Sequence, residues 1–228
     1  MRKSSKLIST MLVASMTLSV TACGGDGTSA STGDTDAAAV SQDNSSASAE
    51  NTGNGTYEIG ILQQLEHPAL DAASEGFMTA LNDLLGEDNV TFDLQNAQGE
   101  QANCSSIATT FVSNNYDLIL ANATTALQCA SAATSTIPIL GTSITDYATA
   151  LDIDNWTGAT GTNVSGTSDL APLDQQEDML VELFPDAKNV GIIYCSAEPN
   201  SAYQATKFGE YLTEDGMSFK EYTIAEYK

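Results

Sequence analysis

The amino-acid sequence predicts an α/β fold built around parallel strands. From Tyr57 onward, short apolar runs alternate with amphipathic stretches, and polar residues follow directly after several of these runs. That alternation is typical of βαβ units, in which each helix returns the chain to the start of the next parallel strand. We therefore expect one complete doubly wound parallel-sheet lobe over residues 56–166 and an incomplete second α/β lobe over residues 167–228.

The elements of the first lobe follow from residue patterns. In the first predicted helix, apolar Ala73, Phe77 and Leu81 recur at steps of four, which indicates one buried face. Thr124 or Thr125 is expected to cap the third helix, and Pro138 suggests that the fourth strand ends there or lies at an edge. The expected strands are 59–62, 90–94, 118–121, 137–140 and a short one near 161–164, and the expected helices are 70–85, 101–112 and 124–134.

The second lobe is expected to be incomplete. After Asp169 the pattern gives a helix at 173–183, a strand at 190–194, a helix at 201–212 and a strand near 219–223. Two strands and two helices cannot cover both faces of a sheet. We therefore expect a C-terminally truncated chain in which Val190, Ile192, Ile193 and Phe208 stay partly exposed.

The N-terminal segment predicts an exported lipoprotein. Residues 1–22 begin with a basic stretch, continue as an apolar run and contain no acidic residue, which is the pattern of a secretory signal peptide. The small residues before Cys23 resemble the lipobox of bacterial lipoproteins, in which the cysteine is diacylated. An incidental cysteine after an ordinary signal peptide is the alternative. Residues 23–55 predict an acylated cysteine and a flexible acidic tether, because no aromatic or basic residue follows the cysteine there.

Charge and composition exclude several functions. The chain has 7 basic against 30 acidic residues and a net charge of −23, so it should repel nucleic acids and anionic lipid headgroups. It has one histidine and lacks a phosphate-binding loop, a nucleophile elbow and a zinc-protease motif, which are the usual parts of hydrolases and phosphoryl-transfer enzymes. We predict no enzyme activity, no cofactor and no metal site.

Three cysteines fall in the predicted lobes. Cys104, Cys129 and Cys195 lack the C-x-x-C spacing of a metal or redox motif, and an odd number leaves at least one thiol unpaired. Either all three are small, semi-buried fillers, or Cys104 and Cys129 form a disulfide. The second reading rests on the expectation that the helices after the second and third strands lie on the same face of the sheet.

Five segments together resemble one protein family. They are residues 59–63 (Ile-Gly-Ile-Leu-Gln), 66–71 (Glu-His-Pro-Ala-Leu-Asp), 96–100 (Asn-Ala-Gln-Gly-Glu), 117–119 (Asp-Leu-Ile) and 162–169 (Thr-Asn-Val-Ser-Gly-Thr-Ser-Asp). From about residue 57 to residue 228 the chain resembles the solute-binding lipoproteins of ABC importers, in the tryptophan/tyrosine-type branch of the type I periplasmic-binding fold. The resemblance implies a ligand held between two lobes, and ABC permease subunits as partners.

Ligand-binding residues are expected at the carboxyl ends of the strands, where helix N-termini present free N–H groups. An amino acid needs donors for its carboxylate, an acceptor for its ammonium group and an apolar slot. Thr124 and Thr125 suit the carboxylate, and Asp146 is a candidate ammonium partner. The full set of candidates is Gln63, Glu66, His67, Thr124, Thr125, Thr142, Ser143, Asp146, Ser168, Asp169, Ser196, Asn200 and Ser201.

Structural roles stay open for these candidates. Glu66 could simply favour the start of the helix that follows Pro68, and Ser168 and Asp169 could form a hinge turn. Asn200 or Ser201 could cap the next helix. The sequence alone therefore does not separate ligand contacts from local structure at these positions.

The sequence as a whole predicts an extracytoplasmic solute-binding lipoprotein, held at the cell membrane by its lipid anchor. It would capture a small solute, with an aromatic amino acid as the suspected ligand, and deliver it to a permease. The alternative is a lipoprotein of the same fold that senses its ligand for a membrane receptor.

Replacing Cys23 with Ala tests the lipid anchor. Without a thiol to acylate, the C23A protein should leave the membrane fraction and incorporate no labelled fatty acid, because acyl chains contribute about 0.8 kcal/mol per buried methylene. Fatty-acid labelling of the variant equal to that of the wild type would contradict the lipoprotein prediction.

Overall fold

The computed structural model describes residues 56–225. The predicted signal peptide, Cys23 and the tether lie outside these residues, so they remain predictions. The described chain forms two parallel sheets, one of five strands and one of two. The expected α/β fold with parallel strands is confirmed.

The first sheet has the strand order β2-β1-β3-β4-β5, and every neighbouring pair is parallel. The chain thus leaves β1 for β2 on one side and then returns to place β3 on the other side. Its strands are β1 (Tyr57–Gln63), β2 (Val90–Asn96), β3 (Leu118–Asn122), β4 (Ile139–Ile144) and β5 (Val164–Ser168); its helices are α1 (Pro68–Leu85), α2 (Gln101–Ser113), α3 (Thr124–Ala133) and α4 (Tyr147–Ala150), with a 3-10 turn, η1 (Glu87–Asn89), before β2.

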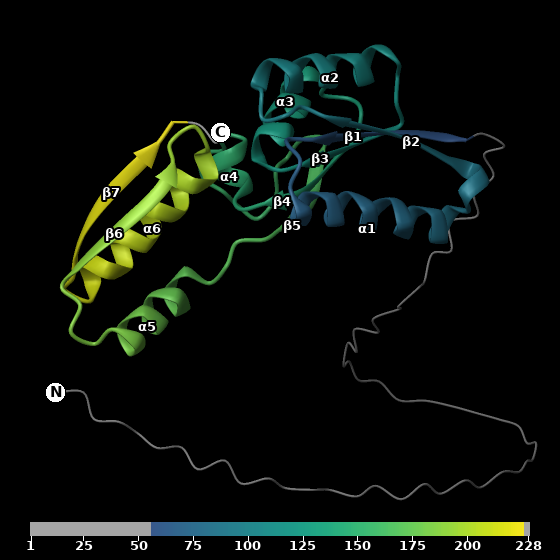
Figure 1. Ribbon diagram of the computed structural model, residues 1–228. Helices are drawn as coiled ribbons and strands as arrows, with labels where there is room; N and C mark the ends of the chain where they lie inside the picture. Colours follow the sequence, from purple (N-terminus) through teal and green to yellow (C-terminus); the bar gives the residue numbers. More distant parts are fainter. Residues whose placement is uncertain (1–55, 226–228) are drawn as a thin grey trace, which may run out of the picture. The chain divides into compact units, whose positions relative to one another are not determined.

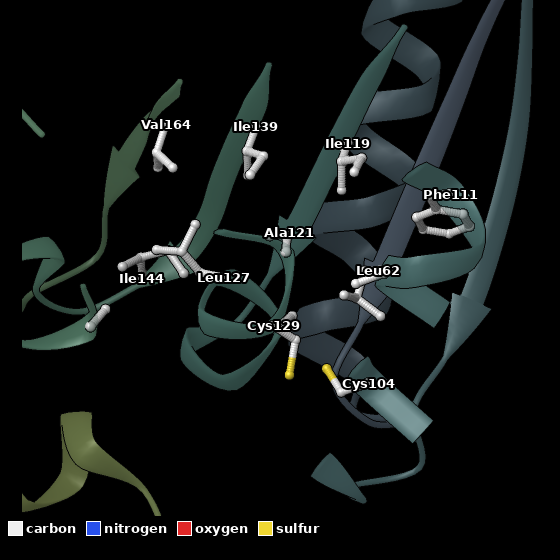
Figure 2. Packing of buried hydrophobic residues seen from close by; sticks show 14 of the residues in the cluster. Leu62, Cys104, Phe111, Ile119, Ala121, Leu127, Cys129, Ile139, Ile144 and Val164 are labelled. Carbon is white, nitrogen blue, oxygen red and sulfur yellow. The ribbon is translucent and has the colours of Figure 1, made fainter. Parts of the chain in front are cut away.

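The main hydrophobic core lies between this sheet and helices α2 and α3. Figure 1 shows these two helices on one face of the sheet and α1 on the opposite face. Alternate strand residues such as Leu62, Ile119 and Ile139 meet Phe111 and Leu127 from the helices (Figure 2), and all five are almost completely buried. Burying such side chains stabilises the fold by roughly 1.5–3 kcal/mol each.

The face of the sheet that carries α1 is less completely covered. Leu120 is buried there, whereas Leu140 and Thr142 are half-buried and Ser165 and Thr167 on β5 are exposed. A cavity of about 410 Å³ lies beside α1 over β4 and β5. The sheet is thus packed unequally on its two faces.

The second sheet pairs β6 with β7 in parallel. Helix α6 packs against it, with Phe219 lying over Gly209, where a Cβ atom would not fit. Val190, Ile192 and Phe208 are half-buried and Ile193 is 76% exposed, so the prediction of partial exposure is confirmed. The elements are α5 (Leu173–Leu183), β6 (Asn189–Cys195), α6 (Pro199–Glu214) and β7 (Ser218–Ile224).

Several predicted boundaries were wrong. The fifth strand runs over residues 164–168 instead of near 161–164, so the predicted lobe boundary after residue 166 falls within it. Ala123, with φ of 91°, holds the cap position of α3, and neither threonine caps that helix. Helix α6 starts at Pro199, so Asn200 and Ser201 lie in its first turn. Pro138 immediately precedes β4, so the prediction that it marks a strand end is confirmed. The alternative of an edge strand is wrong, because β4 is an interior strand.

Within residues 56–225, no helix is both long and apolar enough to cross a bilayer.

Gly166 and Gly76 offer a matched test of the packing between β4 and β5. Gly166 has φ of 151°, and a Cβ atom there would overlap the Gly141 backbone and the Tyr147 hydroxyl, whereas a Cβ atom on helical Gly76 meets nothing within 4 Å. G166A should lower the free energy of unfolding by at least about 2 kcal/mol. G76A should raise it by up to about 1 kcal/mol.

Urea unfolding followed by circular dichroism measures both changes. Equal transition midpoints for G166A and the wild type would contradict the described packing of β5 on β4.

Candidate ligand-binding site

The carboxyl ends of β1 and β3 lie side by side at the point where the strand order reverses. Gln63 pairs with Asn122 in the register of the two strands, and the Gln64 N–H donates to the Asn122 carbonyl at 3.2 Å. In open parallel sheets, ligands bind in the crevice outside such a switch point. The residues that follow these two strands are therefore the first candidates for ligand contact.

Gln63 lies at this edge, but its side chain points toward α1. Its Oε1 accepts from Ser74 Oγ at 2.8 Å, and its Nε2 donates to Asp71 Oδ1 at 2.6 Å and to the Leu65 carbonyl at 3.0 Å. Asn122 Nδ2 extends the network by donating to Ser74 Oγ at 2.9 Å. Both donors of the Gln63 amide are used, so the side chain ties β1 to α1.

The side chain of Gln64, which was not among the predicted site residues, extends toward α3 and Glu198 instead. Its Oε1 accepts from the Thr125 backbone N–H at 3.2 Å, and its Nε2 donates to Glu198 Oε1 at 2.7 Å. The side chain is almost fully buried. One amide therefore joins the first turn of α3 to a carboxylate 134 positions away in the sequence.

Thr124 and Thr125 form the first turn of α3. Thr124 is buried and Thr125 is half-buried. No side chain caps the helix, and the Thr125 N–H meets Gln64 instead. The start of a helix carries partial positive charge and unpaired N–H groups, which favour an anion. Thr125 therefore supplies a donor suited to a carboxylate.

Glu66 and His67 are both exposed at the start of α1. His67 is the residue that caps this helix, and its Nδ1 accepts from the Ala69 N–H at 3.2 Å. This contact gives His67 the local structural role that remained open from the sequence. A ligand contact by either residue remains a prediction.

The candidates within β4, directly after it and at the end of β5 also make local structural contacts. Asp146 Oδ1 accepts from the Thr149 N–H at 2.7 Å and caps α4, and Ser143 has φ of 57° in an irregular part of β4. Ser168 Oγ donates to the Thr145 carbonyl at 2.8 Å, and the Asp169 N–H donates to the Ile144 carbonyl. These contacts continue the pairing of β5 with β4, so both residues have a structural role, and a ligand contact by either residue remains a prediction.

Thr142 and Tyr147 lie on opposite faces of the same sheet edge. The Thr142 carbonyl accepts from the Ala123 N–H at 3.0 Å, which fixes the turn before α3. Burial, and then the charge of Asp169, raise the pKa of Tyr147 to about 12. Its hydroxyl therefore stays protonated and lies 3.0 Å from the Gly141 carbonyl and 3.2 Å from the Thr167 carbonyl, so Tyr147 is a packing residue.

The loop between β6 and α6 provides the second group of candidates. Ser196 is exposed and its Oγ donates to the Ile224 carbonyl, while the Ser201 N–H donates to the Glu198 carbonyl. Asn200 Oδ1 is buried and has no hydrogen-bond partner among the described residues. Asn200, in the first turn of α6, therefore has an acceptor still to be satisfied.

Glu198 has the environment of a binding group. Its side chain is half-buried, and burial raises the pKa of its carboxyl, while the hydrogen bond from Gln64 acts in the opposite direction. A half-buried carboxylate interacts strongly with a cation because little water screens it. Glu198 is thus better placed to hold an ammonium group than Asp146, whose Oδ1 caps a helix.

Three cavities that are not lined by Gln64, Thr125 or Glu198 contain some of the remaining candidates. Ser168 lines a space of about 500 Å³ beside Trp156, Thr142 lines the one beside α1, and Ser201 lines one of about 300 Å³ over β6. Across residues 56–225, no cluster of His, Cys, Asp and Glu could hold a metal ion. The structure thus brings together Gln64, Thr125 and Glu198, and it scatters much of the predicted set.

The architecture defines a class of protein. A doubly wound parallel sheet followed by a second parallel α/β unit is characteristic of the type I periplasmic binding proteins. A conserved domain protein from Vibrio cholerae O1 biovar El Tor matches with a TM-score of 0.70 and 32% identity, covering 75% of this chain and 58% of that chain. The predicted fold class is confirmed.

The chain belongs to the family of ABC transporter substrate binding proteins, whose model matches residues 58–228. A tyrosine-binding protein from Clostridioides difficile is 40% identical over 169 residues. The match covers 73% of this chain and 49% of the relative, so the chain spans about half the length of that curated protein. The structure of an ABC domain from Streptococcus pneumoniae in complex with L-Trp is 31% identical, with a TM-score of 0.69, over 75% of this chain and 58% of that chain.

A substitution at Gln63 tests its structural role. Q63A removes the acceptor for Ser74 and the donor to Asp71 from a buried network, so it should lower the free energy of unfolding by about 2 kcal/mol. Q95A, on the neighbouring strand and exposed, should change it by less than about 0.5 kcal/mol. Chemical denaturation measures both, and equal effects would refute the assignment of Gln63 to the fold.

Proposed function

We propose that this protein is an extracytoplasmic substrate-binding lipoprotein of an ABC importer and that its ligand is an aromatic amino acid. Membership of the family supports substrate binding. The aromatic ligand is supported by the tyrosine-binding relative and by the neighbour that holds L-Trp. Delivery to a permease and anchoring through Cys23 are parts of the same proposal.

The bridge made by Gln64 is the observation that carries the proposal. Its amide oxygen accepts from Thr125 at the start of α3, and its amide nitrogen donates to the carboxylate of Glu198. An α-amino acid likewise has an acceptor and a donor close together, in its carboxylate and its ammonium group. The two protein groups that hold the Gln64 amide are therefore complementary to a zwitterion.

In this scheme each end of the zwitterion has its own partner. The ligand carboxylate accepts from the Thr125 N–H and gains from the positive end of α3, a contribution of about 0.3–1 kcal/mol or more where partly buried. The ammonium group donates to Glu198, and hydrogen bonds of this charged kind contribute about 1.5–3 kcal/mol. Gln64 must release both groups for the ligand to bind.

Helix α6 also offers an aromatic side chain for the ligand ring. Tyr203 is half-buried, one turn after Asn200. The pKa of Tyr203 is raised, first by burial and then by the charge of Asp146. Asp146 follows β4, so this phenol lies near residues of the first sheet, and offset stacking on it would contribute about 0.5–1.5 kcal/mol.

Isothermal titration calorimetry tests the two-point recognition of the zwitterion. L-Tyrosine should bind, whereas tyramine, which lacks the carboxylate, and 3-(4-hydroxyphenyl)propionate, which lacks the ammonium group, should bind at least about 10-fold more weakly. E198Q should weaken L-tyrosine binding by about 10- to 100-fold. E214Q, an exposed change on the same helix, should leave it unaltered.

The pH dependence provides a second readout. The raised pKa of Glu198 means that its carboxyl takes up a proton at a higher pH than an ordinary glutamate. Since the ligand ammonium group needs the carboxylate, affinity should fall as the pH drops from neutral through that raised pKa, and the decrease should be absent in E198Q. Equal binding of tyrosine and tyramine, or an unchanged affinity in E198Q, would overturn the proposed site.

A further inference from the structure

Two buried cysteines face each other across the contact between α2 and α3. Cys104 is 1% exposed and Cys129 is 6% exposed. In Figure 2 the two sulfur atoms lie next to each other, one from each helix. Both are free thiols in the structure, as expected if they fill space, yet their approach is also the one expected of a disulfide pair.

The other polar contacts of the two sulfur atoms do not separate them from each other. Cys104 Sγ lies 3.8 Å from the Thr125 carbonyl oxygen, and Cys129 Sγ lies 3.5 Å from Ser105 Oγ, which are weak hydrogen-bond contacts because a thiol is a weak donor and acceptor. Burial raises the pKa of Cys104, and the neighbouring Cys129 thiol raises it further. Each sulfur therefore belongs to the immediate environment of the other.

The third described cysteine, Cys195, lies in a different part of the fold from the other two. Cys195 is buried at the end of β6, in the second sheet. Its register partner in that sheet is Ile224, and the nearby Ser196 and Glu198 contain no sulfur. Cys195 thus serves as an internal control for what burial alone does to a cysteine in this protein.

We propose that Cys104 and Cys129 form an intramolecular disulfide that ties α2 to α3 when the protein folds in the presence of a disulfide oxidant. The oxidant is a small-molecule disulfide or an oxidised dithiol protein. One cysteine thiolate attacks the oxidant and releases one of its sulfurs as a thiol; the second thiolate then displaces the other. Two cysteines are oxidised, one disulfide of the oxidant is reduced to two thiols, and two protons pass from the cysteines to those products.

Burial determines when this bond can form. The thiolate is the reactive species, and a raised pKa makes it scarce in the folded protein. An oxidant also has little access to side chains that are exposed by a few per cent. Oxidation should therefore be fast during folding, before α2 packs on α3, and slow in the folded protein, where it waits for local opening.

The bond would restrain the helix that starts at the proposed ligand site. Cys104 contacts the carbonyl of Thr125, whose N–H holds the Gln64 amide. A crosslink between α2 and α3 would limit the unfolded chain and keep the first turn of α3 on its support. This inference does not depend on the identity of the ligand, and its test requires none.

Peptide mapping of the full chain tests the proposal. The reduced protein is refolded from denaturant with oxidised and reduced glutathione, alkylated, and cleaved before aspartate without reduction. Cleavage at Asp93, Asp117 and Asp146 places Cys104 in residues 93–116 and Cys129 in residues 117–145, while Cys23 and Cys195 fall in other peptides. The expected product is the linked pair of these two peptides, with Cys195 alkylated.

Matched variants and stability complete the test. C195S should retain the linked peptide, whereas C104S and C129S should lose it. Oxidised wild-type protein should melt about 5–10 °C higher than the same protein in dithiothreitol, a difference that C104S abolishes. Alkylation of both cysteines in the refolded wild type, or glutathione left on either of them, would overturn the proposal whether or not the variants fold.

Discussion

The pairing of β1 with both β2 and β3 is the constraint on which the rest of the structure depends. Because β1 lies between β2 and β3, the carboxyl ends of β1 and β3 lie side by side at one edge of the sheet. Helix α3 begins shortly after β3 at the same edge. The hydrogen bond from the Gln64 N–H to the Asn122 carbonyl continues this pairing beyond the last residue of β1. A switch point of this kind is where backbone donors can be left for a ligand.

Two adjacent glutamines, Gln63 and Gln64, have different roles at this edge of the sheet. Gln63 points to the α1 face and is used by Ser74 and Asp71, so it fixes the strand against the helix. Gln64 lies past the strand and connects α3 with Glu198. The same type of side chain thus supports the fold at position 63 and holds the proposed ligand-binding groups at position 64, because successive residues of an extended chain point in opposite directions.

The sequence indicated most of the fold because most elements carry an apolar pattern. It placed the fifth strand near residues 161–164 instead of 164–168, because Ser165, Gly166 and Thr167 include no large apolar residue and the strand is held by backbone pairing and a glycine contact. The ligand-binding site was harder to predict from the sequence than the fold. Period-two counting from Ile59 assigns Gln63 to the α1 side, but no local pattern marks a contact between Gln64 and a glutamate in the other sheet, since that contact depends on tertiary packing.

The L-tyrosine affinity of Q64A shows whether the Gln64 amide competes with the ligand zwitterion for the Thr125 N–H and the Glu198 carboxylate. If the amide competes with the ligand, removing it should tighten binding by about 3- to 10-fold, because the Thr125 N–H and the Glu198 carboxylate are then unpaired before the ligand arrives. If Gln64 instead contacts the bound ligand, Q64A should bind L-tyrosine more weakly than the wild type, and that result would contradict the account.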